Sequence, residues 1–218
     1  MDDLTLIVTL IIGVTGYVSY LGFEKKTFFY DHAFNVNNIL RGKDYKRLFT
    51  SGLLHADWMH FGFNMLTLYF FGPILEQKVG PLWFLGIYTV SLLGGNLLSL
   101  YLNKANGYYT AVGASGAVTG IIFACIAMFP DMNLYLMLLP IPIPSWAFGL
   151  LYVSYSVYGI KSKRDNIGHE AHLGGGIAGL LIALIHSPLM LSENYLPILF
   201  ILVPSTLFLL VVTRKPRL

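Results

Sequence analysis

The sequence predicts an all-α membrane protein, a polytopic helix bundle that forms a single domain over residues 1–218. Composition is the first reason: 56% of the residues are hydrophobic and only 11% are charged, whereas a soluble domain carries about 25% charged residues. The second reason is that the apolar residues gather in continuous runs and do not alternate with polar ones. Since lipid offers no partner to an open backbone, continuous runs of this kind favour membrane helices.

Seven apolar runs are candidates for these helices, and a span needs roughly 20 residues, so the chain suffices for one compact bundle. The runs cover residues 4–23, 59–75, 82–102, 112–129, 145–160, 171–186 and 195–212. The first run has no basic start and no small-residue cleavage pattern after it. We therefore expect it to be retained as a span.

Two connections between the runs are unusual. Residues 24–57 mix aromatic and charged side chains, which is typical of a partly structured loop in the membrane interface or of an ordinary solvated loop. Residues 133–144 are apolar, yet Pro140, Pro142 and Pro144 exclude a helix there. We expect this second segment to enter the bilayer at an angle before a helix that starts near Ser145.

Charge and cysteine content exclude several function classes. The net charge of +3 forms no continuous basic face, so we expect no nucleic-acid partner. The single cysteine, Cys125, lies in an apolar run and provides neither a disulfide nor a thiolate zinc site. We also expect no cofactor and no bound metal.

A hydroxyl and an imidazole lie inside apolar runs, where a bilayer penalises both. Ser115, in Gly113-Ala114-Ser115-Gly116, stands near the start of its run, and helix starts offer unpaired N–H groups that suit an oxyanion. His172 stands at the start of another run on the same membrane side, where it is placed to act as a base toward the serine. Small residues recur at a spacing of four in both runs and predict close packing of the two helices: Gly116 and Gly120, and Gly175 and Gly179.

His60 and Asn64 are four residues apart in the second run, so they share a helix face and can both donate hydrogen bonds to one small anion. Each polar residue taken alone also has a structural interpretation. A membrane serine commonly bonds back to a carbonyl of its own helix, and His or Asn commonly joins neighbouring helices.

Three motifs, quoted as they stand, resemble the rhomboid family of intramembrane serine proteases: RLFTSGLLHADWMHFGFN at residues 47–64, GASG at 113–116 and AHLGG at 171–175. The resemblance implies a six-helix core, with residues 195–212 as an additional C-terminal helix. It implies Ser115 as nucleophile and His172 as general base and acid, without an acidic third member. It also implies that His60, Asn64 and the Ser115 backbone N–H form the oxyanion hole, whereas His55 is structural.

The resemblance further implies substrates that are single-pass transmembrane proteins reaching the site from lipid. We expect a plasma (inner) membrane location. Two positions depart from the family's pattern. Lys46-Arg47 stands where the family has a Trp-Arg pair, and Thr119 stands where many relatives carry an aromatic side chain that stacks on the catalytic histidine.

Membrane orientation has two opposed predictions. By loop parity, every Lys and Arg except Lys78 lies on the side that holds residues 24–57, and the basic Arg214-Lys215-Pro216-Arg217 tail contributes to this excess. The positive-inside rule turns that side, which carries the site, toward the cytoplasm. The family resemblance implies a site that opens outward.

Two other functions are compatible with the sequence. His169 and His172, with Glu170 between them, are candidate ligands of a membrane metal site, although the full His-Glu-x-x-His pattern is absent. A catalytically silent rhomboid relative that binds membrane clients is the other, but such proteins usually lack the serine or the histidine, and both are present here.

Overall fold

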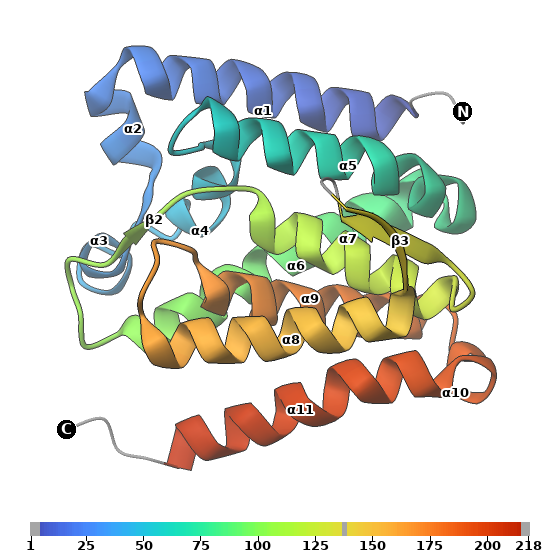
Figure 1. Ribbon diagram of the computed structural model, residues 1–218. Coiled ribbons are helices and arrows are strands. Elements are labelled where there is room, and N and C mark those ends of the chain that lie inside the picture. The colour runs from blue at the N-terminus through green and yellow to red at the C-terminus, as the bar shows by residue number, and fades with distance from the viewer. Residues whose placement is uncertain (1–4, 137–138, 215–218) are drawn as a thin grey trace.

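The structure, a computed structural model, describes residues 5–136 and 139–214. Within these residues a long helix occupies each of the seven apolar runs, so the prediction of an all-α bundle with an additional C-terminal helix is confirmed (Figure 1). The long helices are α1 (Leu6–Glu24), α5 (Trp58–Val79), α6 (Pro81–Asn103), α7 (Ser115–Met128), α8 (Ser145–Ser162), α9 (His169–His186) and α11 (Tyr195–Arg214). A single turn, α10 (Met190–Glu193), precedes α11. The basic tail beyond Arg214 lies outside the described residues.

Helix α7 is the centre of the bundle. Every residue from Gly116 to Met128 is buried, because α5, α6, α8 and α9 all pack against this helix. Helix α1 lies beside α5 at one edge, and α11 lies beside α8 at the other (Figure 1). A helix of only 14 residues is sufficient at the centre, since protein surrounds it on all sides.

Length and composition mark three helices as able to cross a membrane, among the residues that the structure describes: α1, α6 and residues Tyr195–Val212 of α11. Helices α5 and α9 are long but carry the polar residues of the candidate site, His60 and Asn64 on α5 and His169, Glu170 and His172 on α9. These polar side chains face protein or a cavity, so they lower the mean hydropathy without facing lipid.

Glycine brings α7 and α9 together, as the spacing predicts. A Cβ atom added to Gly175 would collide with the backbone of Gly116. One added to Gly179 would lie 2.5 Å from the Cα atom and 2.6 Å from the carbonyl oxygen of Gly120. The two helix backbones are therefore in direct contact, which fixes the relative height of their first turns.

The connection between α1 and α5 is partly structured, as expected. It contains α2 (Lys26–His32), β1 (Phe34–Asn35), α3 (Val36–Leu40), α4 (Arg47–Thr50) and the 3₁₀ turn η1 (Ser51–Leu53). Strand β1 pairs antiparallel with β2 (Thr110–Ala111), just before α7. Buried Arg47 donates hydrogen bonds to the carbonyls of Tyr30 (2.6 Å) and Ala33 (2.8 Å) and to the Asp44 carboxylate (2.8 Å). This connection therefore holds a defined shape against the start of α7; its place in the membrane interface stays a prediction.

Residues 133–144 form no helix, which confirms the effect of the prolines; residues 137 and 138 lie outside the described residues. The segment is instead an antiparallel pair, β3 (Asn133–Leu136) and β4 (Leu139–Pro144). Its base is closed where the Ser145 N–H donates to the Met132 carbonyl at 3.0 Å and the Ser145 hydroxyl donates to the Pro130 carbonyl at 3.0 Å. Helix α8 begins at Ser145, as predicted.

We expect Gly179→Ala to reduce the free energy of unfolding by about 1–3 kcal/mol, because the new methyl group has no room against the Gly120 backbone. Reversible unfolding in detergent micelles measures this change. The matched control is Gly86→Ala on α6, where an added Cβ has no neighbour within 4 Å. Equal stability of the two variants would contradict the proposed close contact.

Candidate active site

Ser115 is the first residue of α7, so the first N–H groups of the helix have no acceptor within it. The turn before it depends on Gly113, whose φ of +131° is unfavourable for other residues. The Gly113 N–H donates to the Ser51 carbonyl at 3.0 Å, and the Ala114 N–H donates to His55 Nε2 at 3.4 Å. These contacts fix the direction in which the serine and the helix start point.

His60 lies against the same turn. A Cβ atom on Gly113 would be 2.8 Å from His60 Nε2 and 3.7 Å from Ser115 Oγ, so the ring and the hydroxyl border the same small volume. The His60 backbone N–H is held by the Asp57 carboxylate at 2.7 Å, which caps α5. The ring is thereby placed beside the start of α7.

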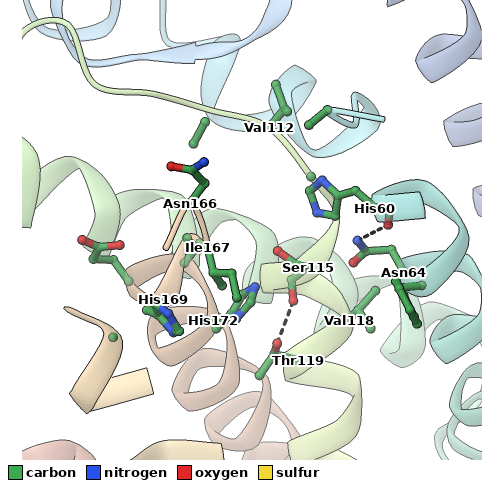
Figure 2. Close-up of a pocket in the computed structure, with 18 of the residues that line it drawn as sticks. His60, Asn64, Val112, Ser115, Val118, Thr119, Asn166, Ile167, His169 and His172 are labelled. Atoms are coloured by element: carbon green, nitrogen blue, oxygen red, sulfur yellow. Dashed lines mark hydrogen bonds between the residues drawn. The ribbon is translucent and has the colours of Figure 1, made fainter. Parts of the chain in front are cut away.

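Asn64 lies one turn further along α5, next to His60 (Figure 2). Its amide nitrogen donates to the His60 carbonyl at 2.9 Å. An amide nitrogen carries two hydrogens, so a second donor is left for an anion. Figure 2 shows Ser115 between His60 and Asn64 on one side and His172 on the other.

His172 lies in the first turn of α9, and its ring Nδ1 is 3.1 Å from the Tyr152 hydroxyl on α8. Among the described residues no hydrogen bond joins the His172 ring to the Ser115 hydroxyl. Catalytic hydrogen bonds are often long without substrate and shorten when it binds, so this geometry is compatible with a Ser/His pair. The contact with Tyr152 comes from a residue that the sequence analysis did not single out.

One cavity of about 1310 Å³ joins these groups. Its lining includes all four predicted site residues, Ser115, His172, His60 and Asn64. Apolar side chains such as Ile122 and Phe148 line other parts of it. Polar groups from α5, α7 and α9 therefore meet in a space large enough for a peptide segment.

His169 and Glu170, the other members of the suggested metal site, have partners of their own. His169 Nε2 lies 3.1 Å from the Asp165 carboxylate, and the Glu170 carboxylate accepts a hydrogen bond from Asn103 at 3.4 Å. Within residues 5–136 and 139–214, no three His, Cys, Asp or Glu side chains are grouped so as to hold a metal ion. The geometry gives the metal alternative no support.

His55 holds the residue that precedes Ser115 through a hydrogen bond. It is fully buried in the connection before α5, where Nδ1 lies 2.9 Å from the Ser19 hydroxyl and Nε2 accepts from the Ala114 N–H. Burial, and next the neighbouring His60, lower the pKa of His55 to about 3. The ring therefore stays neutral and keeps its acceptor for the residue before Ser115.

The family model described as Rhomboid domain matches residues 42–189, which include Ser115, His172, His60 and Asn64. The chain belongs to the rhomboid family. It is 31% identical over 134 residues to "Rhomboid protein 1, mitochondrial" of Saccharomyces cerevisiae, covering 60% of this chain and 39% of that protein. It is 29% identical over 191 residues to "RHOMBOID-like protein 12, mitochondrial" of Arabidopsis thaliana, covering 80% of this chain and 56% of that protein.

A bacterial relative is the "Putative rhomboid protease YdcA" of Bacillus subtilis, 28% identical over 141 residues, or 64% of this chain and 66% of that protein. The rhomboid family match confirms the resemblance given by the three motifs. The chain spans 39% and 56% of the lengths of the yeast and Arabidopsis relatives.

The pH dependence of stability tests the role of His55. The pKa of His55 is lower in the folded protein than the unfolded value of 6.5, so its stabilising contribution is complete above pH 6.5 and is lost as the pH falls toward 3. Between pH 7 and pH 5 this residue should reduce the free energy of unfolding by about 2 kcal/mol. His55→Gln should remove that part of the dependence, measured by unfolding in detergent, whereas His32→Gln, at a half-buried position of α2, should retain it. Identical pH dependence in wild type and His55→Gln would refute this role.

Proposed function

We propose that this rhomboid-family protein is an intramembrane serine endopeptidase, which hydrolyses peptide bonds in or near the transmembrane helices of single-pass membrane proteins. The proposal rests on the shared cavity. Its lining includes Ser115, His172, His60 and Asn64, which come from three different helices. The family to which the chain belongs includes serine proteases, and this chain retains both the serine and the histidine of the motifs.

In the proposed first step, His172 takes the proton of the Ser115 hydroxyl as Oγ attacks the substrate carbonyl carbon. The carbonyl π bond breaks and its electrons form an oxyanion. The Ser115 backbone N–H, the His60 ring and the second Asn64 N–H would donate hydrogen bonds to that oxyanion. The partial positive charge at the start of α7 adds to this stabilisation.

Collapse of the tetrahedral intermediate expels the amine half of the substrate, which takes the proton from His172. The acyl group stays on Ser115 as an ester. Water then gives a proton to His172 and attacks the ester, and Ser115 leaves with its proton restored. The cavity has room and polar lining for the water that this reaction between groups on membrane helices requires.

A catalytically silent, client-binding member of the family is the second candidate. The presence of both Ser115 and His172 favours the protease. For location we propose a plasma (inner) membrane; the mitochondrial location in two relatives' names belongs to those proteins. Fractionation of cells that produce the tagged chain tests the location, and accessibility of a cysteine introduced near Ser162 tests the orientation.

Ser115→Ala should abolish both cleavage of a transmembrane peptide panel and labelling by a fluorophosphonate probe, because no other oxygen occupies that place. His172→Ala should reduce both to background while the protein still unfolds cooperatively, since a ring facing a cavity contributes little packing. The matched control is Ser154→Ala on the exposed face of α8, which should cleave as wild type. Labelling that persists in Ser115→Ala would disprove the nucleophile.

Asn64→Ala should reduce kcat by roughly 10²-fold with little change in KM, because its amide acts on the oxyanion and not on the bound substrate. The control is Gln77→Ala, an amide removed at the exposed far end of the same helix. Steady-state cleavage in detergent measures both. An unaltered kcat would remove Asn64 from the oxyanion hole and leave the Ser/His pair in place.

A further inference from the structure

Three hydrogen bonds connect the ring of His172 to the backbone of Ser115. His172 Nδ1 lies 3.1 Å from the Tyr152 hydroxyl, and that hydroxyl lies 3.0 Å from the Thr119 hydroxyl. Thr119 Oγ1 lies 2.7 Å from the Ser115 carbonyl oxygen, the contact drawn as a dashed line in Figure 2. This series of hydrogen bonds therefore links α9 through α8 to α7.

Counting protons gives the direction of every bond. The Ser115 carbonyl oxygen can only accept a hydrogen bond, so the Thr119 hydroxyl donates its single hydrogen to it. The contact between Thr119 and Tyr152 must then use the proton of Tyr152. Tyr152 has no second proton, so it accepts from His172, and Nδ1 must carry a hydrogen.

A neutral imidazole has one N–H, so a hydrogen on Nδ1 leaves Nε2 with a free lone pair. That form of His172 is the one able to take the proton of a serine hydroxyl through Nε2. The two hydroxyl groups therefore favour the His172 tautomer that has its hydrogen on Nδ1 and a free lone pair on Nε2, and no carboxylate is needed.

Packing holds the tyrosine where this requires. Its ring contacts Phe123 edge-on at a centroid distance of 5.7 Å and lies 5.9 Å from the ring of Phe148. The His172 ring lies 5.9 Å from the Tyr152 ring, tilted by 37°. Tyr152 thus supplies an aromatic neighbour to the histidine from α8, whereas residue 119 of α7 is a threonine.

We propose that Tyr152 is a positioning residue for the reaction, and that Thr119 sets the direction of its hydroxyl so that His172 carries its proton on Nδ1. This inference rests on the proposed function of Ser115 and His172. Neither residue is assigned to touch substrate; both act through the histidine ring.

The test begins with the kinetics of three single variants of the full chain. Tyr152→Phe should lower kcat about 10-fold with KM nearly unchanged, the loss of one neutral hydrogen bond that favours the reactive form. Thr119→Val should lower kcat further, about 30-fold, because Tyr152 is then free to donate to Nδ1 and stabilise the opposite form. Thr119→Ser keeps a hydroxyl and should restore activity to within about twofold.

The double variant Thr119→Val/Tyr152→Phe separates this mechanism from a packing role. With the tyrosine hydroxyl gone, nothing donates to Nδ1, so the double variant should be about 3-fold more active than Thr119→Val alone and equal to Tyr152→Phe. A packing role predicts a double variant no better than either single one, and that result would overturn the inference. Tyr158→Phe, the same change at an exposed position of α8, is the matched control and should cleave as wild type.

The position of the hydrogen on the His172 ring can be measured by nitrogen NMR, without an activity assay. In protein labelled with ¹⁵N in its histidine rings, at about pH 8, the His172 signals, assigned by their loss in His172→Ala, should show hydrogen on Nδ1. Thr119→Val should move the hydrogen to Nε2, and Tyr152→Phe should give a mixture. Hydrogen on Nε2 in wild type would overturn the inference.

The two proposals fail in different ways. If Ser115→Ala still cleaves, the proposed function is wrong, and the nitrogen signals still decide whether the hydroxyl chain sets the ring's form. If Ser115→Ala is inactive while Tyr152→Phe and Thr119→Val match wild type in kinetics and spectra, only the positioning role is wrong.

Discussion

The direct contact between the backbones of α7 and α9 determines how the bundle is assembled and where its candidate site lies. Lipid offers helices no hydrophobic reason to associate, so close van der Waals packing must supply much of the attraction. Glycines at 116, 120, 175 and 179 remove the side chains that would separate the two helices. Because the contact begins at the first turns, it brings the starts of both helices to one end of the bundle, where Ser115 and His172 line the same cavity.

Around this contact, buried polar groups that hold the backbone surround the proposed catalytic groups. Neutral His55 and buried Arg47 hold the chain before α5, and Gly113 turns it so that α7 can start beside the His60 ring. His55 and Arg47 are costly to bury in a membrane protein, and both are paired: His55 with a hydroxyl and a backbone N–H, and Arg47 with two carbonyls and a carboxylate. Their hydrogen bonds fix the orientation of the candidate site. His172 is likewise held by hydrogen bonds, with the hydroxyl of Tyr152 as its partner in place of a carboxylate.

The features that could be predicted from the sequence are those that a bilayer requires, namely continuous apolar helices, and those that it penalises, namely polar residues inside them. Continuous apolar runs predicted all seven long helices, and polar residues inside them indicated Ser115, His172, His60 and Asn64 as a candidate site. The β3–β4 pair was missed, because prolines predict the absence of a helix but not the pairing of what remains. Tyr152 was missed because a tyrosine in an apolar run has no distinctive spacing; the only signal was Thr119, where the family's aromatic residue is absent. The role proposed for Tyr152 depends on hydrogen-bond partners that lie on three helices, which no single segment of sequence contains.

A structure of the protein inactivated by a fluorophosphonate would test the proposed Ser/His site and oxyanion hole together, since the phosphonyl group imitates the tetrahedral intermediate. We expect a covalent bond to Ser115 Oγ, with the phosphonyl oxygen within about 3 Å of the Ser115 N–H and of donors on His60 and Asn64. His172 Nε2 should lie beside the same adduct, with Nδ1 still on Tyr152. An adduct on another residue, or a phosphonyl oxygen turned away from α5 with the His172 ring out of reach, would contradict it.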